Sequence, residues 1–275
     1  MTRIDCRQLA PAMADLRANR ELTCAAIDDA VAAGSQLIVL PELATSGYMF
    51  ESLAEARSVA TAADHEVFAD WSALVRKGSA VVIGGFCEPA PEGGVYNSAA
   101  VIDGTGVLAV YRKLHLWDTE KNFFTPGSEL PPLVDTEFGR IGVIICYDLE
   151  FPELTRSVAL QGADLLAVPT NWPLVARPEG ERPPEVQIGM AAARVNRMAI
   201  ACCDRIGTER GQEWTGGTTI IDECGWVVST AGEGNVAAAD IDLTLGRNKV
   251  LTERAHTFRD RRPEFYGTVT EVASA

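Results

Sequence analysis

The chain has 275 residues, and its 47% of apolar residues are enough to fill the core of one large globular domain. The formal net charge of -14 gives a surface that repels phosphate backbones and anionic lipid headgroups, which argues against nucleic-acid and membrane partners. No apolar run has the length of a signal peptide or approaches the roughly 18–20 residues that span a bilayer. We therefore expect a cytoplasmic protein.

The cysteines and histidines give no sign of a disulfide framework or a metal site. Seven cysteines are an odd number without a CxxC pair, which argues against disulfide cross-links and a zinc ribbon. The three histidines, His65, His115 and His256, do not have a metal-binding spacing. We predict no metal and no cofactor. Six cysteines are expected to be small buried side chains, namely Cys6, Cys24, Cys87, Cys202, Cys203 and Cys224.

Two stretches of the chain follow the same pattern of helix, glycine and buried strand. Apolar residues at helical spacing over 11–33 end at Gly34, before the apolar strand 37–40. A second helix over 152–160 ends at Gly162, before the strand 165–168. Because AGSQLIVLPE and QGADLLAVPT match at several positions, the sequence indicates two similar halves.

The remaining elements alternate between strands and helices. An Asp-Gly-Thr-Gly turn between the strands 97–102 and 107–111 predicts a hairpin. This alternation predicts one layered α/β domain over 1–275, with 177–185 as a loop and 246–275 as a peripheral C-terminal tail. Other expected strands are 80–86, 141–145, 199–203, 218–222, 226–229 and 236–241, and the other expected helices are 52–62, 64–77 and 185–197.

Polar side chains follow several of the apolar strands. Glu42 follows the strand 37–40, Lys113 follows 107–111, Cys146 follows 141–145 and Asn171 follows 165–168. Functional groups gather at strand ends in α/β sheets because the sheet holds them rigidly while the next loop leaves room for a ligand. These four residues are therefore a candidate single site.

A carboxylate, an ammonium and a thiol together match one kind of reaction. A free thiol has a pKa of about 8.5, so it needs a base to attack a carbonyl carbon at neutral pH. Glu42 can accept that proton, and Lys113 can stabilise the thiolate and then the oxyanion of the tetrahedral intermediate. The N–H that follows Cys146 is a second donor to the oxyanion. This combination predicts thiol-dependent hydrolysis of an amide.

Three segments, LPELATSGY, YRKLHLWDTEKNFFTPG and GVIICYDLEFPE, resemble the signature segments of the nitrilase superfamily of carbon-nitrogen hydrolases. The resemblance implies a four-layer α-β-β-α sandwich that pairs through helices into a homodimer or larger homo-oligomer. It also implies a catalytic triad of Glu42, Lys113 and Cys146. The family's additional glutamate, which positions the substrate and supports the triad, corresponds to Glu120.

The surroundings of the triad indicate which bond is cleaved. True nitrilases typically have Cys-Trp-Glu at the nucleophile, whereas this chain has Cys146, Tyr147 and Asp148, as in the amidase and N-carbamoyl hydrolase branches. A small primary amide is therefore the predicted substrate, and nitrile hydrolysis ranks last. The residues near the strand ends that are candidates for substrate binding are Tyr48, His115, Trp117, Tyr147, Asn171 and Trp172.

Three alternatives stay open beside the amidase. An N-carbamoyl amino acid hydrolase would use the same triad and needs a clamp for a carboxylate, for which Arg177 and Arg182 are candidates. A catalytically silent interaction protein would release no ammonia, and the intact triad argues against it. A Cys-His-Glu glutamine amidotransferase needs a histidine base, and no histidine here follows a strand with a glutamate two residues later.

Overall fold

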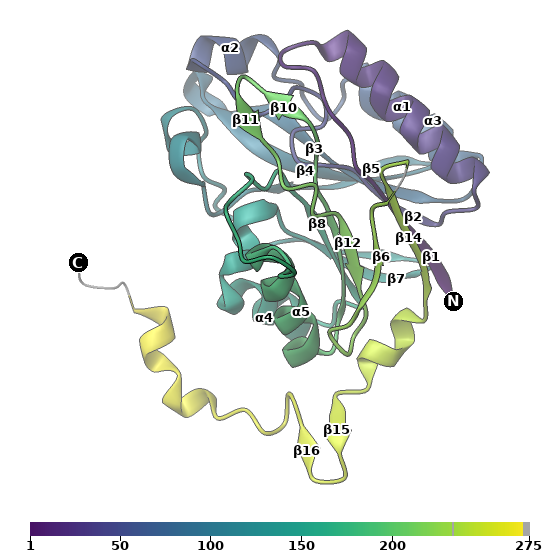
Figure 1. The fold of residues 1–275 in the computed structure, drawn as a ribbon, viewed down its shortest axis with the longest axis vertical. Helices are drawn as coiled ribbons and strands as arrows, with labels where there is room; N and C mark the ends of the chain where they lie inside the picture. Colours follow the sequence, from purple (N-terminus) through teal and green to yellow (C-terminus); the bar gives the residue numbers. More distant parts are fainter. Residues whose placement is uncertain (233, 272–275) are drawn as a thin grey trace.

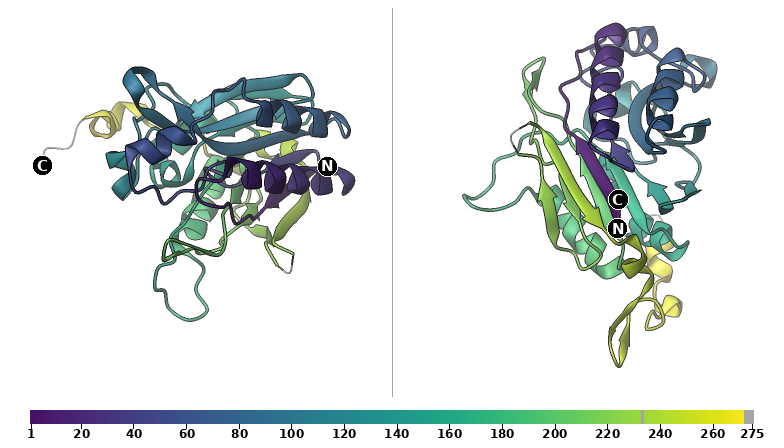
Figure 2. Two further views of the ribbon diagram at one scale, coloured as in Figure 1. Left: turned by 90° about the horizontal axis from the view of Figure 1, so that it is seen from above. Right: turned by 90° about the vertical axis from the view of Figure 1, so that its right-hand side faces the viewer.

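A computed structural model describes residues 1–232 and 234–271 of the chain. Two six-stranded sheets pack face to face, with helices on the outer side of each (Figures 1 and 2). The helices α1 and α3 cover the first sheet, and α4 and α5 cover the second. This arrangement confirms the expected four-layer α-β-β-α sandwich. The helices are α1 (Leu16–Ala32), α2 (Leu53–Ser58), α3 (Glu66–Arg76), α4 (Pro152–Leu160) and α5 (Pro184–Asn196).

The two sheets have the same internal plan. In each sheet three central strands run parallel, and two antiparallel strands follow on one side. In sheet order, the first contains β14 (Val236–Ile241), β1 (Thr2–Arg7), β2 (Leu37–Val39), β3 (Val81–Pro89), β4 (Val95–Asp103) and β5 (Gly106–Arg112). The second contains β13 (Val227–Thr230), β12 (Thr219–Ile221), β9 (Ala199–Cys203), β8 (Leu165–Pro169), β7 (Gly139–Val143) and β6 (Leu133–Thr136).

The strand β2 is apolar throughout because both of its faces are covered. Leu37 and Val39 belong to the large cluster that joins the two sheets, whereas Ile38 and Leu40 pack in the cluster beneath α1 and α3. Successive side chains of a strand point to opposite faces, so this alternation follows from the strand geometry. The strand ends that carry polar side chains are thereby held between two packed layers.

Several element boundaries differ from the sequence prediction, and local hydrogen bonds explain them. The first helix begins at Leu16 rather than near 11, because the Asp15 side chain accepts a hydrogen bond from the N–H of Ala18 and caps it there. The strand β7 ends at Val143 rather than at 145, because the N–H of Ile145 donates to the Asp148 carboxylate, 3.1 Å away. The bounds of the strand β1 were not predicted from the sequence.

The chain after β14 lies at the edge of the molecule, where it projects at the lower end of Figure 1. It contains the small hairpin of β15 (Val250–Thr252) and β16 (Ala255–His256) and the short 3-10 helices Leu243–Arg247, Pro263–Phe265 and Gly267–Thr270. The predicted tail over 246–275 includes residues 272–275, which lie outside the described residues. A second small hairpin pairs β10 (Thr208–Glu209) with β11 (Gln212–Glu213).

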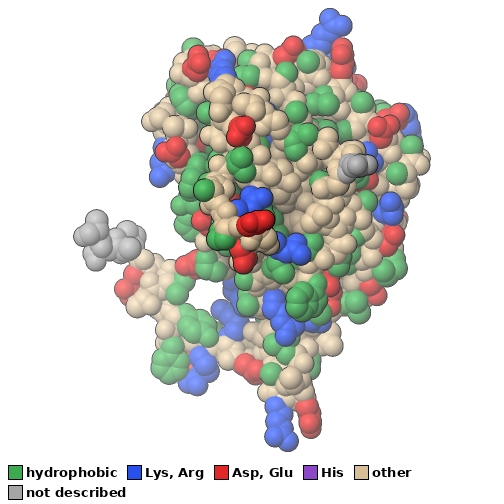
Figure 3. Space-filling model, viewed as in Figure 1, with side chains coloured by type: hydrophobic (Ala, Val, Ile, Leu, Met, Phe, Trp, Pro, Cys, Tyr) green, Lys and Arg blue, Asp and Glu red, His purple; other side chains and the backbone are tan. Residues whose placement is uncertain are grey.

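The cysteines are less uniform than the sequence analysis predicted. Cys6, Cys87, Cys202 and Cys203 are buried as expected, but Cys24 and Cys224 are only half-buried. Among the described residues, no helix combines the length and the apolar character needed to cross a membrane. Figure 3 shows acidic and basic side chains interspersed over the viewed face rather than gathered by sign.

Candidate active site

The side chains of three predicted site residues meet in one buried cluster of charges. Glu42 lies three residues after β2, Lys113 directly follows β5, and Glu120 lies in the 3-10 helix Asp118–Asn122. The Lys113 Nζ is 2.6 Å from Glu42 Oε1 and 2.8 Å from Glu120 Oε1. Since all three side chains are almost completely buried, solvent screens these ion pairs weakly.

Asn97 completes this cluster, and sequence reasoning missed it. Its Nδ2 donates to Glu42 Oε1 at 2.7 Å and to Glu120 Oε1 at 2.9 Å, so one amide bridges both carboxylates. Asn97 lies on β4, and its carbonyl accepts the backbone N–H of Lys113 at 2.8 Å. A neutral residue inside an expected strand gives no sequence signal for such a role.

Burial and neighbouring charges act differently on the pKa values of Glu42 and Lys113. Burial raises the pKa of Glu42 to about 7, and the charge of Glu120 adds to this effect while Lys113 opposes it. Burial alone would lower the pKa of Lys113, but the charges of Glu120, Glu42 and Cys146 outweigh burial and raise it. Lys113 therefore stays an ammonium at neutral pH, and Glu42 titrates near neutrality.

The second carboxylate oxygen of Glu42 is available for chemistry. Glu42 Oε2 is buried and has no hydrogen-bond partner among the described residues, while Oε1 is held by Lys113 and Asn97. A buried carboxylate oxygen without a donor is costly in a native structure. This oxygen is thus suited to accept a proton from a group brought beside it.

Cys146 lies at the start of the 3-10 helix Cys146–Glu150, three residues after the end of β7 in the second sheet. Its φ of 48° is in the left-handed region, which is uncommon for a residue with a side chain. Its Sγ is 3.9 Å from the carbonyl oxygen of Asn171. Burial and the charge of Glu42 raise the pKa of the thiol well above its usual range, and Lys113 opposes them. The resting side chain is therefore a neutral thiol.

The segment after β8 connects the two halves at the site. The Asn171 side chain donates to the backbone carbonyl of Glu42 at 2.9 Å, so it ties the end of β2 to the second sheet. Trp172 is buried, and its backbone N–H donates to the Asp204 carboxylate at 2.9 Å. Both residues were predicted to bind substrate. In the structure the Asn171 side-chain amide and the Trp172 backbone N–H form hydrogen bonds with other residues of the chain.

Three of the other predicted substrate-binding residues form a row of aromatic contacts with Phe151. Trp117 meets Tyr147 edge to face at 4.8 Å, and Tyr147 meets Phe151 in the same way at 5.1 Å. His115 stacks on Phe151 at 3.6 Å, and its Nδ1 lies 2.8 Å from the Asp148 carboxylate. His115 is therefore engaged with its neighbours, whereas Trp117 is 39% exposed.

Tyr48, the remaining predicted substrate-binding residue, is fixed by a second buried ion pair. Glu209 accepts hydrogen bonds from the N–H groups of Tyr48 and Met49, and its other oxygen pairs with Arg205 at 2.9 Å. The ring of Tyr48 meets Trp214 edge to face at 5.4 Å. Burial, with the charges of Glu120 and Glu42, raises the pKa of the phenol well above its usual range.

The two arginines proposed as a carboxylate clamp are not gathered into a binding site. Arg177 and Arg182 are exposed in the loop that precedes α5, and neither forms an ion pair with another described residue. A group of potential metal ligands, Asp222, Glu223 and Cys224, lies in the hairpin turn after β12. The Arg197 guanidinium is 3.1 Å from Cys224 Sγ, and its charge disfavours a cation there.

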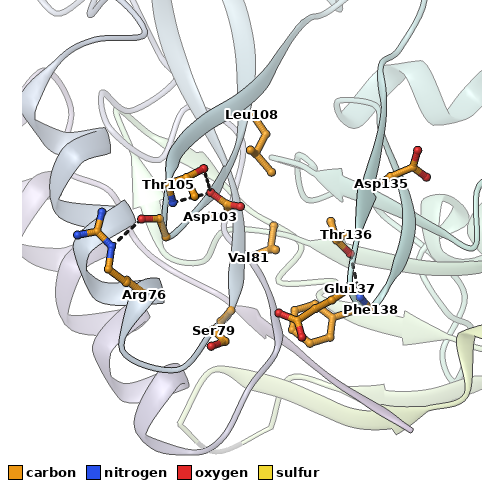
Figure 4. A pocket seen from close by; sticks show the side chains of 12 residues that line it. Arg76, Ser79, Val81, Asp103, Thr105, Leu108, Asp135, Thr136, Glu137 and Phe138 are labelled. Carbon is orange, nitrogen blue, oxygen red and sulfur yellow. Dashed lines mark hydrogen bonds between the residues drawn. The ribbon is translucent and has the colours of Figure 1, made fainter.

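A cavity of about 570 Å³ lies away from the buried cluster of Glu42, Lys113 and Glu120 (Figure 4). Its walls include Asp103 at the end of β4, Thr105 in the turn before β5, and Glu137 and Phe138 in the turn before β7. These turns are at the opposite ends of the two strands from Lys113 and Cys146. The cavity is therefore separate from the predicted active site.

Comparisons with known proteins agree with the fold. The model of the carbon-nitrogen hydrolase family matches residues 3–248. The chain is 36% identical over 244 residues to a nitrilase from Pyrococcus abyssi (strain GE5 / Orsay), which covers 87% of this chain and 89% of the relative. It is 31% identical over 271 residues to an (R)-stereoselective amidase from Pseudomonas sp, which covers 98% of this chain and 94% of the relative.

A solved amidase structure from Nesterenkonia sp. has the same fold. It superposes with a TM-score of 0.78 at 24% identity, over 97% of this chain and 98% of that chain. In one mutant of that amidase, acrylamide has added to the active-site cysteine. On the family match and these relatives, the chain belongs to the carbon-nitrogen hydrolase family, within the nitrilase superfamily.

Proposed function

We propose that this carbon-nitrogen hydrolase is an amidase that converts a small primary amide to a carboxylic acid and ammonia through a thioester on Cys146. The observation that carries the proposal is the Lys113 ammonium held between Glu42 and Glu120, with charge effects from both Lys113 and Glu42 on the Cys146 thiol. The proposal also draws on the (R)-stereoselective amidase relative and on the reactive cysteine of the Nesterenkonia amidase.

The first half of the reaction forms the thioester. Cys146 Sγ attacks the amide carbon while its proton passes to the free Oε2 of Glu42. The carbonyl oxygen becomes an oxyanion that the Lys113 ammonium and the N–H of Tyr147 stabilise. Glu42 then gives its proton to the nitrogen, the carbon-nitrogen bond breaks and ammonia leaves.

The second half returns the enzyme to its resting state. Glu42 takes a proton from a water molecule that attacks the thioester, and a second oxyanion forms in front of Lys113. When this intermediate collapses, the carbon-sulfur bond breaks and the thiolate recovers the proton from Glu42. In the proposed cycle Glu120 and Asn97 keep the Lys113 ammonium aligned with Glu42.

The runner-up is an N-carbamoyl amino acid hydrolase with the same chemistry. Its substrate has a carboxylate that needs a cationic partner, and the candidates Arg177 and Arg182 are exposed in a loop. A nitrile ranks last because its attack places negative charge on nitrogen, which must be protonated in place. In this chain the residues after the nucleophile are Tyr147 and Asp148 rather than Trp and Glu.

The deciding experiment measures ammonia release from propionamide, propionitrile and an N-carbamoyl amino acid, each over a range of concentrations. We expect the largest kcat/KM for the amide and the smallest for the nitrile. A Cys146→Ala variant measured in parallel shows how much release depends on this site. A larger kcat/KM for the nitrile than for the amide would contradict the amidase proposal, and a strong preference for the ureido acid would favour the runner-up.

We also propose that the chain is one catalytic domain with a peripheral tail and that it assembles into a homodimer or larger homo-oligomer. Apolar side chains on the described part of the tail support this, because Phe265 is 69% exposed and Val269 is 52% exposed. Light scattering at micromolar concentration should give at least twice the chain mass. A monomer under these conditions would contradict the assembly.

A further inference from the structure

Asp148 connects the turn that carries Cys146 with the segment that carries Lys113. Its carboxylate is buried, accepts three hydrogen bonds and contacts the His115 ring nitrogen. Oδ2 accepts from the Tyr111 hydroxyl at 2.7 Å and from the N–H of Ile145 at 3.1 Å. Oδ1 lies 3.0 Å from the backbone N of His115 and 2.8 Å from its Nδ1.

Two residues that donate to Asp148 flank Lys113, one on β5 and one in the bend that follows it. Tyr111 precedes Lys113 by two residues and His115 follows it by two, so the two contacts hold the chain on either side of the ammonium-bearing residue. Asp148 therefore fixes the position of this segment from the second sheet.

On the other side, Asp148 closes the turn around Cys146. Its N–H donates to the carbonyl of Ile145 at 3.0 Å, and its side chain accepts from the N–H of the same residue. These two hydrogen bonds enclose Cys146, whose backbone is in the left-handed conformation. Such a conformation persists only where the surrounding structure holds it.

We infer that Asp148 is a positioning residue that sets the distance and orientation between the Cys146 thiol and the Lys113 ammonium. The inference rests on the proposed function. Replacement of the carboxylate by an amide leaves an NH2 group facing donors, because an amide has one acceptor oxygen where the carboxylate has two. In Asp148→Asn the thiol and the ammonium then shift relative to each other while the volume stays the same.

The test combines kinetics with the reactivity of the thiol. In Asp148→Asn we expect kcat for the amide to fall by about 10- to 100-fold, as a displacement near 1 Å does, with little change in KM. Iodoacetamide alkylation of Cys146, followed by peptide mass spectrometry, should slow by about tenfold because the thiolate loses its aligned cation. A variant that is merely loosened would expose the buried thiols, so alkylation of Cys146 and Cys202 would become faster.

Asp164→Asn is the matched control. Asp164 is also a buried carboxylate, and it accepts from the N–H of Arg140 and from the Arg247 guanidinium. It precedes β8 and so lies at the opposite end of that strand from Asn171. This variant should lose stability, while kcat and the alkylation rate of Cys146 stay at the wild-type values.

Tyr111→Phe tests the same contact if Asp148→Asn does not fold. It removes one donor to Asp148 at nearly constant volume, and we expect a fall in kcat of about tenfold or less with slower alkylation of Cys146. The inference is wrong if the folded variants keep the wild-type kcat, or if alkylation of Cys146 is unchanged or faster. The alkylation arm needs no substrate, so it still tests Asp148 if propionamide is not hydrolysed and the proposed function fails.

Discussion

The two sheets share one plan but contribute different chemistry to the site. The first sheet places Glu42 and Lys113 after its strands and Asn97 on β4, and together with Glu120 they form a buried ionic network. The second sheet contributes the Cys146 turn, where burial and the charge of Glu42 raise the pKa of the thiol. The same scaffold therefore holds preformed charge on one side and a buried thiol, the proposed nucleophile, on the other.

The matching segments of the two sheets show where this difference begins. Gly34 and Gly162 both adopt a positive φ at the turns before β2 and β8, with values of 79° and 95°. Glycine tolerates this conformation, which explains why both turns use it. After the strands the sequences diverge, with Glu42 in one half and Thr170 in the other. The scaffold is repeated, and the residues directly after the strands differentiate the halves.

The largest effect should come from removal of the nucleophile on the second sheet. Cys146→Ala should abolish ammonia release, because no other step forms the thioester. The small side chain leaves at most a modest cavity, so the fold should persist. Cys87→Ala, at another buried cysteine, is the control and should keep its activity. Loss of activity in Cys87→Ala with retention in Cys146→Ala would place the nucleophile elsewhere.

Removal of the base on the first sheet should have the next largest effect. Glu42→Gln cannot accept the thiol proton, and loss of such proton transfer typically costs about 10²- to 10⁴-fold in rate. The matched control is Glu88→Gln, since Glu88 is a buried glutamate that accepts from Ser98 and Arg112 outside the site. The measurement is steady-state kcat/KM on the amide. A wild-type rate in Glu42→Gln would rule out Glu42 as the base.

A change of shape at the cation tests whether geometry matters as well as charge. Lys113→Arg keeps the positive charge, but a planar guanidinium does not fit the compact space between Glu42 and Glu120. We expect kcat to fall by about 10²- to 10³-fold, as after the loss of an oxyanion donor. Arg112→Lys, one residue earlier and paired with Glu88, is the control. Rates near wild type for Lys113→Arg would assign Lys113 a role of charge alone.

The sequence was sufficient for the parts of the site that follow strands, and insufficient for the contacts that join them. Glu42, Lys113 and Cys146 were identified because a charge or a thiol after an apolar run is visible as a pattern. Asn97 is hidden inside a strand, and Asp148 was read only as part of a motif. Their partners come from distant segments, and no spacing rule specifies a contact between sheets.

The same limit explains which parts of the fold were predicted. Strands such as 199–203 and 236–241 were located with their observed bounds, because both faces or one whole face of each is apolar. The end of β7 was misplaced because a local side-chain hydrogen bond, from the N–H of Ile145 to Asp148, ends the strand, although the residues 144 and 145 are both isoleucine. The position of this strand end is thus set by a hydrogen bond that the pattern of apolar residues does not predict.

The smallest expected effect is the pH dependence of kcat/KM, and it tests the ionic network itself. Burial, with the charge of Glu120, raises the pKa of Glu42 to about 7, so below this pH the carboxyl is protonated and cannot accept the thiol proton. The rate should fall about tenfold for each pH unit below that value. In Glu120→Gln the raising charge is gone, so this acid limb should move to lower pH. An acid limb that stays in place or moves upward would show that Glu42 is not the titrating group.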